Sequence, residues 1–306
     1  MLKFFKGLVV YFSLGLAIFL PSLVNAAMSS TNYRIQFDSV GVGGLDNPSS
    51  ASYGLRDTLE FIQGIGTSAS YRVDEGYRGG IYDPIVHFTV IAQDTASQVA
   101  ATAITSTSVS VTLATGYVTG DYIAVIQNEG LSQIAAIGRI TSVAGATLNI
   151  DFFTDGGTFP VIDSVNDYVY ELTDTGIPLS SLTPSTAQTG ILAWDVDASV
   201  PEGYSVYVFE DHDLWVSSGT AINDVEDGAV TTSNEEYGGR SSDTTLSGST
   251  FDTADTSFTT SLQQVASRNV STLKSRDFLT LKVAAAETTV DGAYSHTLTV
   301  VFVGDY

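Results

Sequence analysis

Carboxylates are the most abundant side chains in this sequence that could bind or transform a ligand. They crowd residues 202–255, where Asp224, Glu226 and Asp227 stand close together. Calcium takes about six to eight oxygen ligands and accepts loops as its scaffold. The three residues lack the alternating spacing of an EF-hand loop, so a solvated acidic face is the competing interpretation. We therefore keep calcium as a candidate ligand and expect no other cofactor.

No arrangement of residues predicts catalysis. The histidines at positions 87, 212 and 296 are far apart, and neither H-E-x-x-H nor G-x-S-x-G occurs. In a strand, Asp211-His212-Asp213 would place neighbouring side chains on opposite faces, and no serine stands beside it. Glu235 and Glu236 supply paired carboxylates, but a loop rich in Gly and Ser gives neither a reason to become an acid catalyst. We predict that the protein is not an enzyme, and a secreted hydrolase is the third-ranked alternative.

Two tryptophans suggest stacking on sugar rings, which needs a flat apolar surface. Trp194 and Trp215 could form such a platform together with Tyr204, Tyr207 and Tyr237. The alternative is that these aromatic residues are core or cross-strand partners. Glycans are therefore candidate partners.

The N-terminus predicts export. Lys3 and Lys6 precede an uncharged, mostly apolar run at residues 7–20, and small residues around Ala26 follow. The run is shorter than the roughly 20 apolar residues of a spanning helix. This order of basic, apolar and small residues is typical of a secretory signal peptide, here residues 1–26. We expect a secreted or cell-surface protein with no membrane span after cleavage.

Composition points to an acidic all-β chain. The sequence has 12 basic and 34 acidic residues, a formal net charge of −22, and no Cys. Such a charge disfavours nucleic acid as a partner. Because disulfides are absent, stability must come from packing. Ser, Thr, Gly, Val, Tyr and Phe dominate, which favours strands over helices.

We predict three regions after the signal peptide. They are an N-terminal strand and loop arm with a short repeat (27–82), a small β-barrel or sandwich (83–176), and a C-terminal antiparallel β-sandwich (177–306). Apolar and polar residues alternate in many segments of these regions, as strands require. Short turn signals rich in Gly, Asp and Asn separate the segments.

Three segments carry more specific expectations. Residues 87–91 predict a strand of the second region. Residues 278–284 and 294–303 predict a terminal antiparallel pair. Residues 261–270 carry the one helical pattern of the mature chain, with apolar side chains on one side.

The arm contains a strand that lacks a local partner. In residues 32–40, Tyr33, Ile35 and Phe37 alternate with polar residues, and a Gly-rich segment follows. A lone strand can neither satisfy its main chain nor cover its apolar face. We therefore expect these three residues to mediate assembly by adding to a sheet, in the same chain or in a neighbouring copy.

Several short motifs resemble parts of secreted modular β-proteins of environmental bacteria. They are Asn32-Tyr33-Arg34-Ile35, residues 120–125 and 166–172, and Glu235-Glu236-Tyr237-Gly238. Residues 291–300 are similar to the last strands of coat and fibre subunits, namely the spore-coat U type and camelysin-like matrix proteins. The resemblance implies an extracellular structural role and carries over no catalytic residue. The chain departs from the disulfide-bonded spore-coat U pattern because it has no Cys.

These features favour a non-enzymatic structural subunit of a bacterial cell surface or extracellular filament. Such a subunit would self-associate or bind other surface proteins, and the arm would provide the contact. A carbohydrate- or matrix-binding adhesin is the alternative, carried by Trp194 and Trp215.

The secreted protein should begin at Ala27, because Val24 and Ala26 occupy the positions that signal peptidase reads. Intact mass spectrometry of exported material measures the start of the chain. A mass that still includes residues 1–26 would contradict the expected cleavage.

Overall fold

The structure, a computed structural model, divides into two compact units, Met1–Asp83 and Pro84–Tyr306. Its described residues are 49–50, 53–54, 64–67, 72–75, 86–217 and 219–305. The signal peptide and the arm residues Tyr33, Ile35 and Phe37 lie outside these ranges, so both remain predictions.

The described part of the first unit consists of two small hairpins. β1 (Ser49–Ser50) pairs with β2 (Tyr53–Gly54), and β3 (Gly64–Thr67) pairs with β4 (Arg72–Glu75), both antiparallel. Their pairing agrees with the strand and loop character predicted for residues 27–82.

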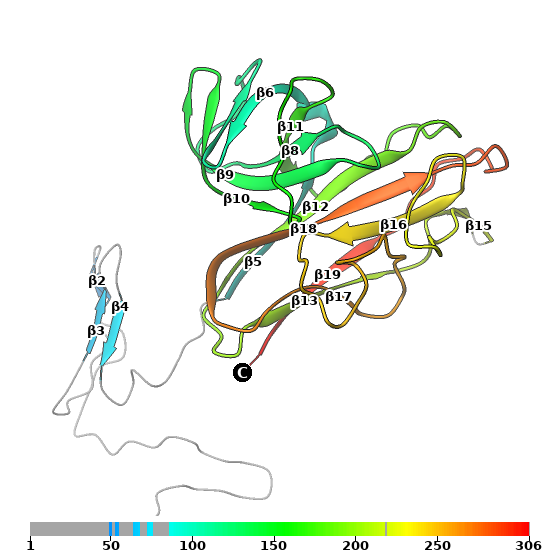
Figure 1. Ribbon diagram of the computed structural model, residues 1–306. Coiled ribbons are helices and arrows are strands. Elements are labelled where there is room, and N and C mark those ends of the chain that lie inside the picture. The colour runs from blue at the N-terminus through cyan, green and yellow to red at the C-terminus, as the bar shows by residue number, and fades with distance from the viewer. Residues whose placement is uncertain are drawn as a thin grey trace, which may run out of the picture. The chain divides into compact units, whose positions relative to one another are not determined.

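The second unit contains a closed six-stranded barrel, which confirms the all-β prediction (Figure 1). Strand order around the barrel is β11-β6-β7-β10-β9-β8, and β8 closes the ring by pairing with β11. The strands are β6 (Val99–Thr105), β7 (Ser108–Val111), β8 (Tyr122–Gln127), β9 (Ile134–Ala144), β10 (Thr147–Asp155) and β11 (Tyr168–Asp174). A single 3-10 turn, η2 (Thr95–Ser97), interrupts the described strands. No helix in the described ranges has the length and apolar character needed to cross a membrane.

A β-sandwich makes up the rest of the second unit, as predicted for the C-terminal region. Sheet I has the order β16-β18-β12-β5, and sheet II has the order β17-β13-β19. The strands are β5 (Val86–Gln93), β12 (Gln188–Ala198), β13 (Tyr204–Glu210), β16 (Glu236–Ser241), β17 (Gln263–Arg268), β18 (Thr272–Ala284) and β19 (Leu298–Gly304). A ribbon of β14 (Trp215–Ser217) and β15 (Thr220–Ala221) extends from the loops. The strand expected at residues 87–91 exists as β5, but it belongs to the sandwich and meets the barrel only at its end, where Gln93 lies opposite Leu172.

The predicted helix at residues 261–270 is wrong, because this segment forms β17. Pairing with β13 shifts by one residue between Val206 and Tyr207, as at a β-bulge. The consecutive residues Val265 and Ala266 are therefore both fully buried. Two adjacent buried residues break the alternation of a strand and imitate one side of a helix.

The predicted pairing of residues 278–284 with residues 294–303 is also wrong. β18 lies in sheet I between β16 and β12, whereas β19 lies in sheet II beside β13. Both segments are strands, but the connection between them crosses from one sheet of the sandwich to the other. Apolar alternation reports that a strand has a buried face and not which strand lies next to it.

Sheet I is the middle of three layers, because the barrel packs on its outer face (Figure 1). On β12, Trp194 and Val196 face sheet II. Ile191 and Ala193 point the other way and pack with the barrel side chains Ile126, Ile137 and Tyr170, among others. Both faces of the central strands of sheet I are thus buried.

Arg276 of β18 ties sheet I to the barrel through buried ion pairs. Its two Nη atoms donate to the carboxylate oxygens of Asp151 on β10, at 2.8 and 2.5 Å. Its Nε donates to Asp195 of the adjacent β12 at 2.7 Å. The guanidinium also lies over the rings of Tyr122 and Phe152, 5.4 and 4.3 Å from their centroids. A planar guanidinium can make these contacts together, so one side chain joins both layers.

The Asp151–Arg276 pair makes the contact between the layers sensitive to acid. Burial acts to raise the pKa of Asp151, but the hydrogen bonds and charge of Arg276, together with the main-chain N–H groups of Phe152 and Arg139, hold the pKa below its usual value. A carboxyl of this kind stabilises the fold above its unfolded pKa of about 4 and loses that contribution as the pH falls through the folded pKa. The stability of the second unit should therefore fall below about pH 4.

Replacing Arg276 with Met should lower the free energy of unfolding by about 3 kcal/mol, because the buried Asp195 and the partly buried Asp151 then lose their partner. Urea denaturation at pH 7 measures the loss. Arg139 is the matched control, since it lies 5.4 Å from the same Tyr122 ring but is exposed. Arg139→Met should cost about 1 kcal/mol or less. Equal losses in the two variants would contradict the role given to Arg276.

Candidate functional site

The inner face of sheet I is left uncovered along β5. Val86, Phe88, Val90 and Ala92 face sheet II, as their pairing with inward residues of β12 shows, with Val90 opposite Trp194. Ala92 is buried and Phe88 is partly buried, but Val86 and Val90 are 43% and 37% exposed. The second sheet of a β-sandwich normally covers such inward valines. Sheet II reaches β5 at Phe88 but leaves Val86 and Val90 partly exposed.

Strand β19 forms the border of sheet II on this side. Its inward residues Leu298, Val300 and Phe302 are only partly buried, and the Phe302 ring lies 5.5 Å from that of Phe88. Among the described strands, β19 pairs with β13 alone, and residues 86–91 pair with β12 alone. Each of the two strands therefore offers one unpaired main-chain edge. We call the apolar strip between these edges, formed by β5 and β19, the seam.

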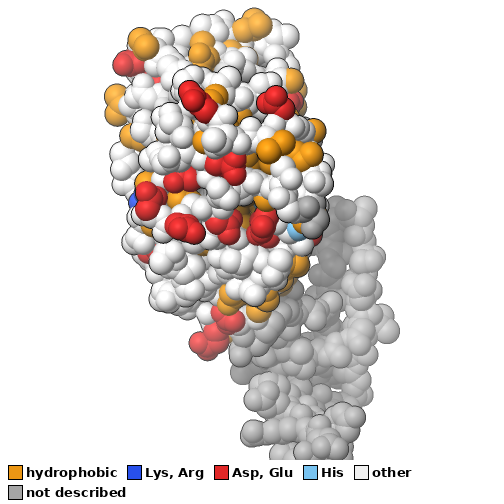
Figure 2. Space-filling view, turned by 90° about the vertical axis from the view of Figure 1, so that its right-hand side faces the viewer, with side chains coloured by type: hydrophobic (Ala, Val, Ile, Leu, Met, Phe, Trp, Pro, Cys, Tyr) orange, Lys and Arg blue, Asp and Glu red, His pale blue; other side chains and the backbone are white. Residues whose placement is uncertain are grey.

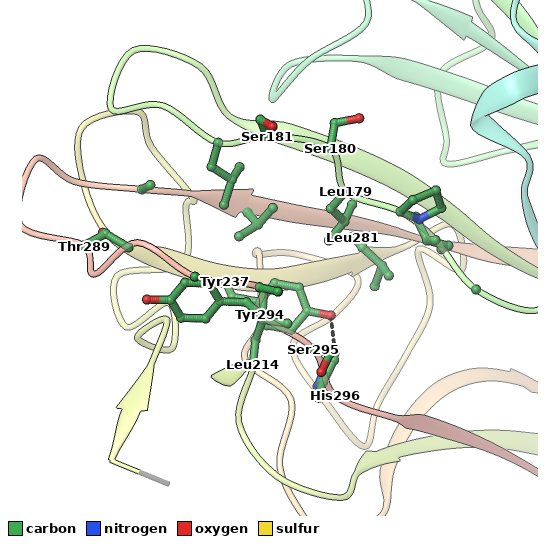
Figure 3. Close-up of a pocket in the computed structure, with 18 of the residues that line it drawn as sticks. Leu179, Ser180, Ser181, Leu214, Tyr237, Leu281, Thr289, Tyr294, Ser295 and His296 are labelled. Carbon is green, nitrogen blue, oxygen red and sulfur yellow. Dashed lines mark hydrogen bonds between the residues drawn. The ribbon is translucent and has the colours of Figure 1, made fainter. Parts of the chain in front are cut away.

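A pocket of about 830 Å³ continues the seam at one end (Figure 3). It shares Ala92 and Leu298 with the seam, and two loops complete its walls, residues 175–184 and residues 285–297. The apolar wall residues are Ile177, Leu179, Leu182, Leu192, Leu214, Leu281, Val283 and Val290. The pocket therefore joins the seam at Ala92 and Leu298, and its wall combines these apolar side chains with polar ones from both loops, such as Ser180, Thr289 and His296.

A largely buried chain of hydrogen bonds borders the pocket, and Figure 3 shows the bond between Tyr237 and His296. The Tyr237 hydroxyl lies 2.9 Å from Nε2 of His296, and Nδ1 of His296 lies 3.1 Å from Oε2 of Glu210. Burial, together with the charges of Glu210 and Asp224, raises the pKa of Tyr237 well above its usual value, so its hydroxyl stays protonated and donates. When the hydroxyl donates to Nε2, the N–H of a neutral His296 ring lies on Nδ1 and faces Oε2 of Glu210. The chain links both sheets to the loop that precedes β19 and so positions that loop.

The calcium candidates lie on the surface. Asp224, Glu226 and Asp227 are all exposed. Among the described residues, no three His, Asp or Glu side chains form a group that could hold a metal ion. Figure 2 shows acidic side chains gathered across one face of the second unit, with very few Lys or Arg side chains. The geometry therefore adds no support to the calcium prediction and fits a solvated acidic face.

The two tryptophans are not equivalent. Trp194 cannot form a stacking platform, which corrects the prediction, because it is 0% exposed on a strand covered by sheet II and by the barrel. Trp215 is partly exposed, but its ring stacks on His212 with centroids 4.1 Å apart. A glycan could therefore reach at most one face of a single tryptophan.

Sequence patterns did not identify Val86 or Val90 as site residues. Alternation did place Leu298, Val300 and Phe302 on one face, and all three pack against the sandwich core. Covered and uncovered strands show the same alternation, so it cannot reveal which inward face lacks a partner. One feature of the sequence could have indicated the seam, namely the absence of charged residues from β5 and β19.

Comparisons with protein-family models, with curated proteins and with solved structures found no match to this chain. Function is therefore inferred from the geometry of the seam and the pocket.

Asp224→Asn should raise the melting temperature at pH 7 and change it little at pH 4. Asp224 reaches solvent, but desolvation by its neighbours, followed by the charges of Glu210, Asp213 and Glu226, raises its pKa to about 6. The stability contribution of such a carboxyl is fully present below its unfolded pKa of about 4 and is lost as the pH rises through about 6. Thermal melts at both pH values measure the difference.

Glu202→Gln is the control, because it also removes one negative charge from an exposed position. Glu202 precedes the first residue of β13, whereas Glu210, the neighbour of Asp224, is the last residue of that strand. It should leave the melting temperature nearly unchanged. An equal rise in melting temperature for both variants would contradict the prediction. It would show that the total charge of the chain, and not the neighbours of Asp224, determines the effect.

Proposed function

We propose that this chain is an exported structural subunit of a bacterial cell surface or extracellular filament, and that subunits join by β-strand addition. The observation that carries the proposal is the seam, where inward apolar residues of β5 lie uncovered between two unpaired strand edges. An added strand would supply both missing elements, since its main chain would pair with an edge and its alternate side chains would cover the valines.

Neither edge strand carries the charged residues or the proline with which natural proteins often block strand addition. Edge strands are commonly protected by charged residues, proline, bulges or a covering segment. β19 reads Leu-Thr-Val-Val-Phe-Val-Gly, and β5 reads Val-His-Phe-Thr-Val-Ile-Ala-Gln. Neither strand contains Asp, Glu, Lys, Arg or Pro, although the whole chain has 34 acidic residues. Uncharged edges in so acidic a chain suit a surface that another strand occupies.

The proposed donor is the arm strand, residues 32–40, of a second copy. Tyr33, Ile35 and Phe37 repeat every second residue, which spaces their side chains by about 6.7 Å along an extended chain. Val86, Phe88 and Val90 repeat in the same way on the acceptor. Residues 41–85 lie between the arm strand and β5, and this length of chain can reach a neighbouring subunit.

The double variant Val86→Asp/Val90→Asp should abolish assembly of the mature protein and leave the subunit folded. Both side chains are more than a third exposed in the free subunit, so the free energy of unfolding should fall by only about 1 kcal/mol. A docked strand would instead bury two unpaired carboxylates, at a cost of several kcal/mol. Light scattering and electron microscopy measure assembly, and circular dichroism checks the fold.

Val303 supplies the matched control. It is 40% exposed on β19, and it alternates with the inward residue Phe302, so it points away from the seam. Val303→Asp should assemble as the unmodified protein does. The proposal is wrong if the unmodified mature protein stays monomeric at high concentration, or if the seam variant assembles equally well.

Deletion of residues 27–44 separates a donor in a neighbouring copy from one in the same chain. A folded monomer that no longer assembles supports donation between copies. A subunit that is destabilised without any change in molecular mass shows that the arm packs on its own chain, and it refutes donation between copies.

A further inference from the structure

Residues 176–182, which we name the strap, cover the pocket end of the seam (Figure 3). Ile177 and Leu179 pack on β12 at Gly190, where any side chain would collide with Ile177. Leu182 also packs against the sandwich core, and all three apolar side chains are only partly buried. The strap therefore fills space between the two sheets that no strand of sheet II occupies.

Few interactions hold the strap in place. Within the described ranges, residues 176–182 belong to no sheet and form no main-chain hydrogen bond with a strand. Ser180 has a φ of 34°, in the left-handed region that is unfavourable for residues with a Cβ. Pro178, Ser180 and Ser181 are exposed. Segments with few buried contacts and an unpaired main chain open at a low free-energy cost.

A docked strand of the predicted length would reach the strap. Nine extended residues, 32–40, span about 30 Å, whereas residues 86–91 of β5 span about 20 Å. The seam meets the pocket at Ala92 and Leu298, and Ile177 and Leu179 lie in the wall of the same pocket. The last residues of the incoming strand and the strap thus compete for the same apolar surface of sheet I.

We propose that the strap is a removable plug, which fills the pocket end of the seam in the free subunit and leaves when a strand docks. This inference rests on the proposed function and adds the regulation of the same site. Apolar side chains of the incoming strand would replace Ile177 and Leu179, so the apolar burial lost when the strap opens is regained on docking. Until then the strap keeps this surface from water and from other partners.

An engineered disulfide can lock the strap. The Cβ of Ile177 lies 3.6 Å from the position that a Cβ would take at Gly190, within the range of about 3.5–4.5 Å found in disulfides. The chain has no Cys of its own, so Ile177→Cys/Gly190→Cys places the only two thiols in the protein. The two measurements are assembly of the mature protein and binding of a labelled synthetic peptide of residues 30–42 to a subunit that lacks residues 27–44. Both are made with oxidised and with reduced protein.

The oxidised variant should bind the peptide with a Kd at least about tenfold higher than the same variant after reduction, and it should assemble more weakly. Both effects are expected because the locked strap blocks the end of the seam. The single variant Ile177→Cys, treated with the same oxidant, should show no such loss. Gly190→Cys alone is not a control, because its side chain would collide with Ile177. If oxidised and reduced forms assemble and bind equally well, strand addition stands and the removable strap is refuted. If neither form assembles or binds the peptide, and the unmodified protein does not either, the proposed function fails and the strap proposal fails with it.

Discussion

An apolar face of a β-sheet is stable in water only under a second layer, and this sandwich has one strand too few to provide that layer everywhere. Sheet I has four strands and sheet II has three, so no strand of sheet II covers all of β5. Val86 and Val90 are exposed for this reason, and no described strand pairs with the free edges of β5 and β19. The pocket and the strap follow from the same shortage, because loop side chains fill the space where a fourth strand of sheet II would lie. The proposed assembly would supply the missing strand from a neighbour.

The barrel explains why sheet I stays ordered beside an open seam. It covers the outer face of β12 and β18 with apolar side chains, and Arg276 joins that face to Asp151 of the barrel. β5 gains support from both sides, since it pairs with β12 along most of its length and with β11 at its end. A binding surface on strands held in this way keeps its geometry better than one on loops. The barrel would thus act as a rigid backing for the acceptor surface.

The all-β class could be predicted from composition and alternation, because both patterns depend on local chemistry. The choice between a barrel and a sandwich for residues 83–176 could not, because it depends on which strands pair. Strand neighbours could not, and β18 and β19 lie in different sheets although both read as apolar strands. The bulge in β17 buries Val265 and Ala266 together and conceals the strand. The seam could not be predicted from the sequence, because the exposure of Val86 and Val90 depends on how far sheet II extends. Trp194 is a core residue and not part of a stacking platform, as is usual for a large aromatic residue on a central strand.

Hydrogen exchange of the main-chain amides in free and assembled protein tests strand addition most directly, because a newly paired edge gains protection. The amides of residues 86–91 or of Leu298–Gly304 should exchange more slowly in the assembled state, together with those of residues 32–40. Amides of the barrel strand β10 should exchange at the same rate in both states. Unchanged exchange at both seam edges in protein that has demonstrably assembled would contradict the account.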